Sequence, residues 1–115
     1  MATWQDVVAL GLRLPEAEES TTYHQPALKV RGRTFAWLSP HEDGALVLRC
    51  DLEERALMIE SQPDVFWTTP HYAGHPMVLA HLDAIGDDEL LDRIAESWLL
   101  TAPPRLAATL APADD

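Results

Sequence analysis

Three apolar runs that alternate with polar residues follow one another in the first half of the chain. They occupy residues 28–31, 34–38 and 46–50. Side chains of a β-strand point to opposite faces with a period of two, so each run predicts a strand with one buried face. Gly32 permits a tight reversal between the first two runs, and Asp43-Gly44 precedes the third. The spacing therefore predicts three consecutive strands that begin with a hairpin.

The N-terminal residues predict a helix. Thr3 followed by Asp6 is a capping pattern, and Trp4, Val8 and Leu12 are spaced four residues apart on one helical face. The next segment, residues 15–20, is expected to be a polar connector.

Two further helices and one strand are predicted in the second half. One helix begins at Asp51 and ends before Pro63, and a strand covers residues 77–82. A last helix begins at Asp87 and ends at Pro103-Pro104. Its expected buried face is formed by Leu90, Ile94 and Trp98. This order predicts an α+β fold in which helices pack on one side of an antiparallel β-sheet.

The composition is that of one globular domain. The chain has 115 residues, of which 47% are apolar and four are tryptophan, enough for one self-sufficient core. We expect a single domain over residues 1–106 and a C-terminal tail over residues 107–115. A lone cysteine, Cys50, and a start without secretory features favour the cytoplasm. No apolar run approaches the roughly 18 residues that span a bilayer, so no membrane partner is expected.

The charge is strongly acidic but unevenly distributed. The formal net charge is −11, while residues 24–50 alone carry +2. A net negative charge repels polyanions at long range, so DNA and anionic lipid are disfavoured as partners.

Three blocks, taken in order, resemble the MmcQ/YjbR family. They are YHQPALKVRGRTFAWL at residues 23–38, TPHYAGHPMVLAHL at residues 69–82 and DDELLDRIAESWLLTAPPRL at residues 87–106. The resemblance runs from about Leu14 to Leu106. It implies an α+β fold of the double-wing type, related to frataxin-like and secretion-chaperone-like folds.

The resemblance also implies candidate functions. The family is commonly described as DNA-binding, and the basic hairpin would be one wing of that arrangement. In the loop motif the matching residues are His71, Tyr72, Gly74 and Pro76. Pro104 stands where relatives tend to have lysine, which leaves Arg105 alone at the end of the last helix.

Signals for catalysis or metal binding are weak. His71 and His75 are four residues apart, but prolines and a glycine make their segment a loop, and no Glu or Cys partner stands at a recognised spacing. We expect His71 to be a buried hydrogen-bonding residue that fixes the loop. Cys50 is expected to be a buried structural residue. No catalytic residue, metal site or cofactor is expected, and the protein is not expected to be an enzyme.

Two surfaces could bind a partner. The basic one consists of Lys29, Arg31, Arg33, Arg49 and Arg105. These cations could contact phosphates from a projecting turn, or could form an ordinary solvated strand face. The aromatic surface lies beside the loop and consists of Phe66, Trp67, His71 and Tyr72. Adjacent strand residues point to opposite faces, so Phe66 and Trp67 cannot both be buried in one core.

We expect a non-catalytic cytoplasmic interaction module that binds a protein or a small ligand of unknown identity. The alternative is DNA binding through the basic hairpin, residues 29–33.

Overall fold

The computed structural model describes residues 2–110, which form a sheet of six strands and four helices. The elements in chain order are α1 (Trp4–Gly11), β1 (Ala17–Thr22), β2 (Gln25–Val30), β3 (Arg33–Leu38), β4 (Ala45–Arg49), α2 (Leu52–Ser61), β5 (Phe66–Trp67), β6 (Met77–His81), α3 (Asp87–Thr101) and α4 (Pro104–Leu110). The predicted α+β class is confirmed. No helix within residues 2–110 combines the length and apolar character needed to cross a membrane.

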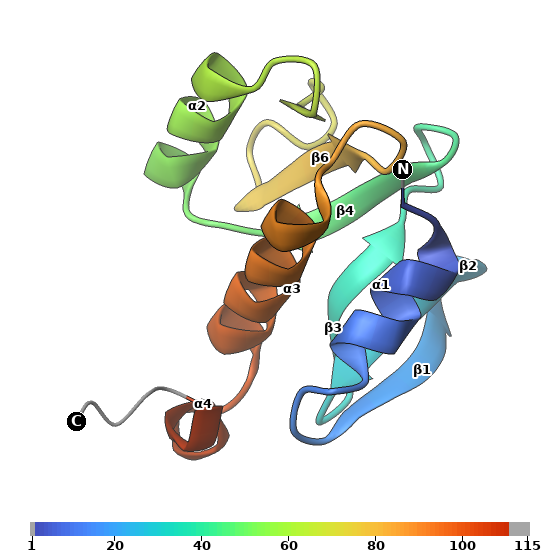
Figure 1. Ribbon diagram of the computed structural model, residues 1–115, viewed down its shortest axis with the longest axis vertical. Coiled ribbons are helices and arrows are strands. Elements are labelled where there is room, and N and C mark those ends of the chain that lie inside the picture. Colours follow the sequence, from blue (N-terminus) through green and yellow to red (C-terminus); the bar gives the residue numbers. More distant parts are fainter. Residues whose placement is uncertain (1, 111–115) are drawn as a thin grey trace.

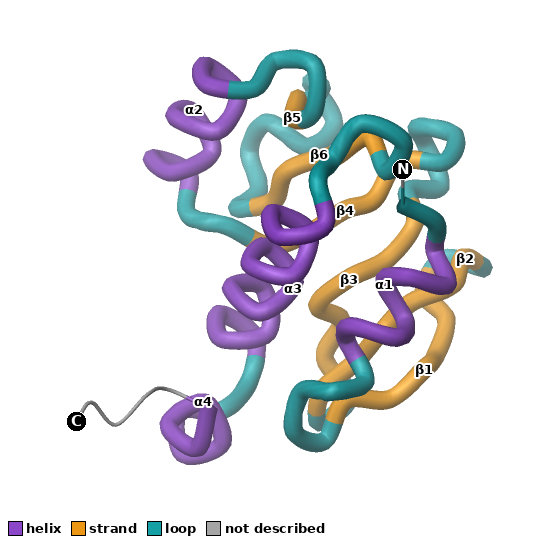
Figure 2. The backbone as a smooth tube through the Cα atoms, viewed as in Figure 1, coloured by secondary structure: helices purple, strands orange, loops and turns teal. Residues whose placement is uncertain are grey.

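The sheet is antiparallel throughout, with the order β1-β2-β3-β4-β6-β5. Helices α1 and α3 lie across one face of it, as Figures 1 and 2 show. The predicted reversal at Gly32 is confirmed, because Arg31 and Gly32 both have positive φ angles between β2 and β3. Within residues 2–110 the opposite face of the sheet carries no helix, and loops cover part of it.

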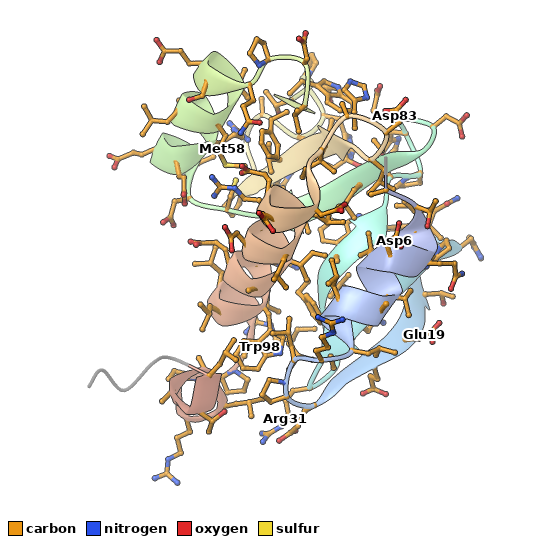
Figure 3. All side chains as sticks on the ribbon, viewed as in Figure 1. Asp6, Glu19, Arg31, Met58, Asp83 and Trp98 are labelled. Carbon is orange, nitrogen blue, oxygen red and sulfur yellow. The ribbon has the colours of Figure 1, made fainter. Side chains whose placement is uncertain are left out.

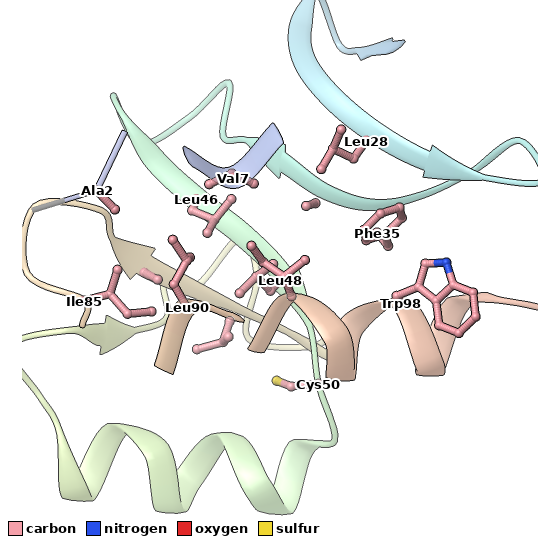
Figure 4. Packing of buried hydrophobic residues seen from close by; sticks show 14 of the residues in the cluster. Ala2, Val7, Leu28, Phe35, Leu46, Leu48, Cys50, Ile85, Leu90 and Trp98 are labelled. Atoms are coloured by element: carbon pink, nitrogen blue, oxygen red, sulfur yellow. The ribbon is translucent and has the colours of Figure 1, made fainter. Parts of the chain in front are cut away.

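The main core lies between the helices and the sheet (Figure 4). The predicted buried face of α3 is confirmed, since Leu90, Ile94 and Trp98 are fully enclosed. The indole nitrogen of Trp98 also donates to the carbonyl oxygen of Pro15 at 3.1 Å, so the buried ring keeps its polar group satisfied. This bond ties α3 to the loop that leads into β1.

Helix α1 begins as predicted, but its buried face differs. Thr3 and Asp6 form the reciprocal capping box. Val7 and Val8 face the core, whereas Leu12 is 43% exposed. The helix ends at Gly11, and Leu12 is its C-cap, beyond the residues that pack on the sheet.

Two segments differ from the sequence-based expectation. Residues 17–22, of which 17–20 were expected in a polar connector, form the edge strand β1, paired with β2 from Ala17 to Thr22. Residues 104–110 form helix α4, and Leu106, Ala107 and Leu110 pack against the main core. The expected tail from residue 107 therefore starts inside a helix; residues 111–115 lie outside the described part of the chain.

A bulge in β3 places Trp37 in a second, smaller core on the other face of the sheet. The pairing of β2 with β3 shifts between Leu28 and Lys29, so Phe35 joins the main core while Trp37 faces the opposite side. Around Trp37 a cluster forms from Ala27, Ala45, Val47, Tyr72 and Leu79. This second cluster is the floor of the candidate site.

Candidate functional site

A pocket of about 200 Å³ opens on the face of the sheet that carries no helix. Its lining residues are Tyr23, Trp37, Pro40, His41, His71, Tyr72, His75 and Met77. They come from the β1–β2 turn, from β3 and the turn after it, and from the loop that leads into β6. Segments distant in the sequence therefore form one concavity.

The loop over residues 69–76 is held in place by Arg55 of α2. The Arg55 Nη1 atom donates to the carbonyl oxygens of His75 at 2.9 Å, Met77 at 3.0 Å and Tyr72 at 3.3 Å, and Nη2 donates to that of Ala73 at 2.9 Å. A planar guanidinium presents five donors in a fixed fork and can reach acceptors that lie apart, whereas a lysine ammonium is a compact group with three donors. One side chain thus fixes the backbone of a pocket wall.

Ser39 and Tyr72 join the two sides of the pocket. Their hydroxyl oxygens are 2.7 Å apart and both residues are buried. Ser39 Oγ also accepts from the backbone N–H groups of His41 and Glu42, each at 3.0 Å. The turn that carries His41 is therefore tied to the loop that carries Tyr72.

Two imidazole rings lie together at the pocket. The ring centroids of His41 and His71 are 4.0 Å apart, and the His71 ring meets Tyr72 edge-on at 4.9 Å. His71 is exposed, so the expectation of a buried histidine that fixes the loop is not met. Arg55 and Tyr72 hold the loop in its place.

Tyr23 reaches the pocket from a strained turn. The β1–β2 hairpin closes through Tyr23 (φ +50°) and His24 (φ +64°), between the paired residues Thr22 and Gln25. Two consecutive positive φ angles define a turn that normally selects Asn-Gly, and a bulky residue there is strained. Tyr23 is nevertheless 72% exposed, so its ring receives little compensating burial.

Phe66 and Trp67 lie outside the pocket lining. Phe66 is fully buried in the main core and therefore cannot contact a partner. Trp67 points to the other face, packs on the second cluster and stacks on His81 with centroids 3.8 Å apart. The expected split of this pair between opposite faces is observed, but of the four aromatic-surface candidates the structure brings together His71 and Tyr72.

The cations proposed for DNA binding are partly engaged within the protein. Arg31, labelled at the lower end of Figure 3, forms an ion pair with Glu16, and this hydrogen bond lowers the pKa of Glu16. Lys29 lies directly across from Glu18 on the neighbouring strand. These carboxylates reduce the positive potential that the hairpin presents to an anion.

Arg49 has a structural role. Its Nε donates to the carbonyl oxygen of Thr34 at 2.8 Å, and its guanidinium lies 5.6 Å from the centroid of the Trp37 ring. Burial and the nearby Arg33 lower its pKa. Arg33 and Arg105 are exposed, the first at the start of β3 and the second on α4.

Cys50 is buried directly after β4, as predicted, and burial raises the pKa of its thiol to about 11. At pH 8 only about one molecule in a thousand then carries the reactive thiolate. We expect Ellman's reagent to label the native protein far more slowly than the guanidinium-unfolded protein. Equal rates in the two states would contradict the buried placement.

A triad of possible metal ligands occurs away from the pocket. Within residues 2–110, ligand atoms of Asp51, Glu54 and Glu96 come within 4.8 Å of one another. Burial, followed by the charge of Glu54, raises the pKa of Glu96. The pocket histidines do not form such a triad in the described structure.

Comparisons with known proteins agree with this architecture. The YjbR family model matches residues 12–100. Uncharacterized proteins Mb2600 of Mycobacterium bovis and Rv2570 of Mycobacterium tuberculosis are each 30% identical to the chain, over 92% of it and 93% of their own length. The crystal structure of Deinococcus radiodurans protein DR2400, a DUF419 domain, superposes with a TM-score of 0.74 at 22% identity, covering 87% of this chain and 78% of that one.

Proposed function

Because the chain belongs to the YjbR family, as its motifs suggested, and carries a braced pocket on its open sheet face, we propose that it is a non-catalytic module that binds a small ligand in this pocket. Family membership establishes the fold, and function must be argued from the site. The observation that carries the proposal is that two independent hydrogen-bond systems, centred on Arg55 and on Ser39, hold the pocket walls in place. Such preorganisation lowers the entropic cost of binding.

The size of the pocket favours a small molecule over a protein partner. Ligand pockets for drug-sized molecules span about 300–1,000 Å³, and this one is smaller, at about 200 Å³. Its lining combines aromatic rings and a thioether with a few polar groups, which is the usual composition of such sites.

The proposed absence of catalysis is supported by the states of the lone cysteine, Cys50, and of Ser39, the buried serine beside the pocket. Cys50 is buried with a raised pKa. Ser39 Oγ is buried and accepts two backbone N–H groups, as a structural hydroxyl does. Neither presents an activated nucleophile to the pocket.

A fragment screen followed by two-dimensional ¹H–¹⁵N NMR tests the proposal. We expect bound fragments to shift the resonances of Trp37, His41 and Tyr72 together, and to leave that of Arg105 in place. A DNA duplex at low salt serves as the comparison, since phosphate contacts are strongest there. The proposal fails if no fragment shifts the pocket resonances, or if the protein binds DNA at micromolar concentration and Arg33→Ala removes that binding.

A further inference from the structure

The pocket lacks negative charge in a protein that is otherwise acidic. None of its eight lining residues is a carboxylic acid and three are histidines, although the whole chain has a net charge of −11. The guanidinium of Arg49 lies over the ring of Trp37, one of the lining residues. Repulsion from the carboxylates outside the lining is screened over roughly 8 Å at physiological salt, and it acts far less on a singly charged molecule than on a polyanion. A small anion therefore fits this pocket.

A count of hydrogen bonds shows that Tyr72 can donate to a ligand. A serine hydroxyl has two acceptor lone pairs, and on Ser39 both face the backbone N–H groups of His41 and Glu42. With both lone pairs engaged, we take the Ser39 hydroxyl as the donor to Tyr72 Oη, at 2.7 Å. Among the described residues the phenol proton of Tyr72 then has no acceptor, and Tyr72 is one of the residues that line the pocket, although it is only 4% exposed.

Tyr23 supplies an exposed aromatic ring at the pocket. Its ring is exposed at the pocket while its backbone occupies a conformation that asparagine or glycine adopts at lower cost. Strain of this kind is typically stored at functional sites, where the side chain is needed for something other than folding. An exposed tyrosine ring over a pocket is suited to stacking on a planar ligand.

We propose that the pocket binds a small aromatic carboxylate. Its ring stacks on Tyr23 and contacts Met77 and the edge of Trp37, and its carboxylate accepts hydrogen bonds from the phenol of Tyr72 and from the imidazoles of His41 and His71. This inference rests on the proposed function and adds to it the chemical class of the ligand.

Isothermal titration calorimetry with four probes tests the ligand class. Benzoate and indole-3-carboxylate are the aromatic anions, benzamide is the neutral match of benzoate, and acetate is an anion without a ring. We expect at least one of the two aromatic carboxylates to bind at least about tenfold more tightly than benzamide and acetate. Benzamide lacks the charge-assisted hydrogen bond and acetate lacks the stacking contact, and each loss costs about that much. If acetate binds as tightly as the aromatic carboxylates, the proposed need for an aromatic ring is wrong. If benzamide binds as tightly as benzoate, the proposed need for a negative charge is wrong.

Two substitutions in one turn separate binding from folding. Tyr23→Asn is expected to raise the melting temperature, because asparagine tolerates the positive φ angle, and to weaken the binding of the better aromatic carboxylate about tenfold. His24→Asn is the matched control, since it changes the other residue of the same turn but lies outside the pocket lining, and it should leave affinity unchanged. Tyr72→Phe should also weaken binding. Unchanged affinity in Tyr23→Asn would overturn the stacking role of Tyr23.

The probes also distinguish failure of this inference from failure of the proposed function. If other fragments shift the pocket resonances but neither aromatic carboxylate binds, the ligand class is overturned and the pocket remains a binding site. If no fragment or probe shifts those resonances, both proposals fall.

Discussion

Arg55→Ala is expected to lower the free energy of unfolding by about 3 kcal/mol and to abolish ligand binding in the pocket. The guanidinium donates to four carbonyl oxygens in residues 72–77. No other residue replaces these bonds in the variant, so the loop loses its connection to α2 and the pocket wall loses its fixed shape. Chemical denaturation measures the loss of stability. Hydrogen exchange in residues 72–77 measures the loss of the loop's fixed shape.

Two matched substitutions test whether the geometry of the guanidinium is responsible. Arg55→Lys keeps the charge but lacks the planar fork, so we expect it to recover less than half of the lost stability. Arg13→Ala removes an exposed arginine that makes no side-chain hydrogen bond within the described residues, and it should change stability by less than about 0.5 kcal/mol. Full recovery by lysine would show that charge alone holds the loop.

The parts of the fold that depend on apolar periodicity could be predicted from the sequence. Leu90, Ile94 and Trp98 recur at helical spacing and form the buried face of α3. The three alternating runs became β2, β3 and β4. In these segments the residues that face the core are also the residues that define the pattern.

Strand β1 could not be predicted in this way. Its sequence, AEESTT at residues 17–22, has no apolar alternation, because it is an edge strand that gains its stability from backbone pairing with β2. Charged side chains on such an edge discourage pairing with other chains. The same charged residues hide the strand in a hydropathy pattern.

The candidate site could be predicted only in part from the sequence. The loop at residues 69–76 and Tyr72 were identified from the motif, whereas Arg55, Ser39 and Tyr23 were not. These residues act through hydrogen bonds to distant backbone, through a buried hydroxyl pair and through a strained turn. None of these contacts leaves a periodic signal in the sequence, because each depends on how separate segments meet in the folded chain.

Ser97 is another residue whose contacts join segments distant in the sequence. Its buried hydroxyl donates to the carbonyl oxygen of Phe35 and accepts from the N–H of Arg49 at 2.9 Å, across separations of 62 and 48 residues. Cα pairing between β3 and β4 ends at Ala36 and Leu48. The Ser97 hydroxyl on α3 therefore bridges the two strands just beyond their last Cα pair.

Ser97→Ala is expected to lower the free energy of unfolding by about 3 kcal/mol, because it leaves two backbone groups beside the core without partners. Hydrogen exchange at the Arg49 amide should accelerate more than exchange at Val47, which lies within the paired part of β4. Ser61→Ala is the control: this serine also lies on a helix, but its hydroxyl is exposed and bonds to the carbonyl oxygen of Leu57 in the same helix. Its loss should cost less than about 0.5 kcal/mol. Equal effects of the two substitutions would mean that α3 is held to the sheet by apolar packing alone, and that the bridge between β3 and β4 contributes nothing to the stability of the pocket floor.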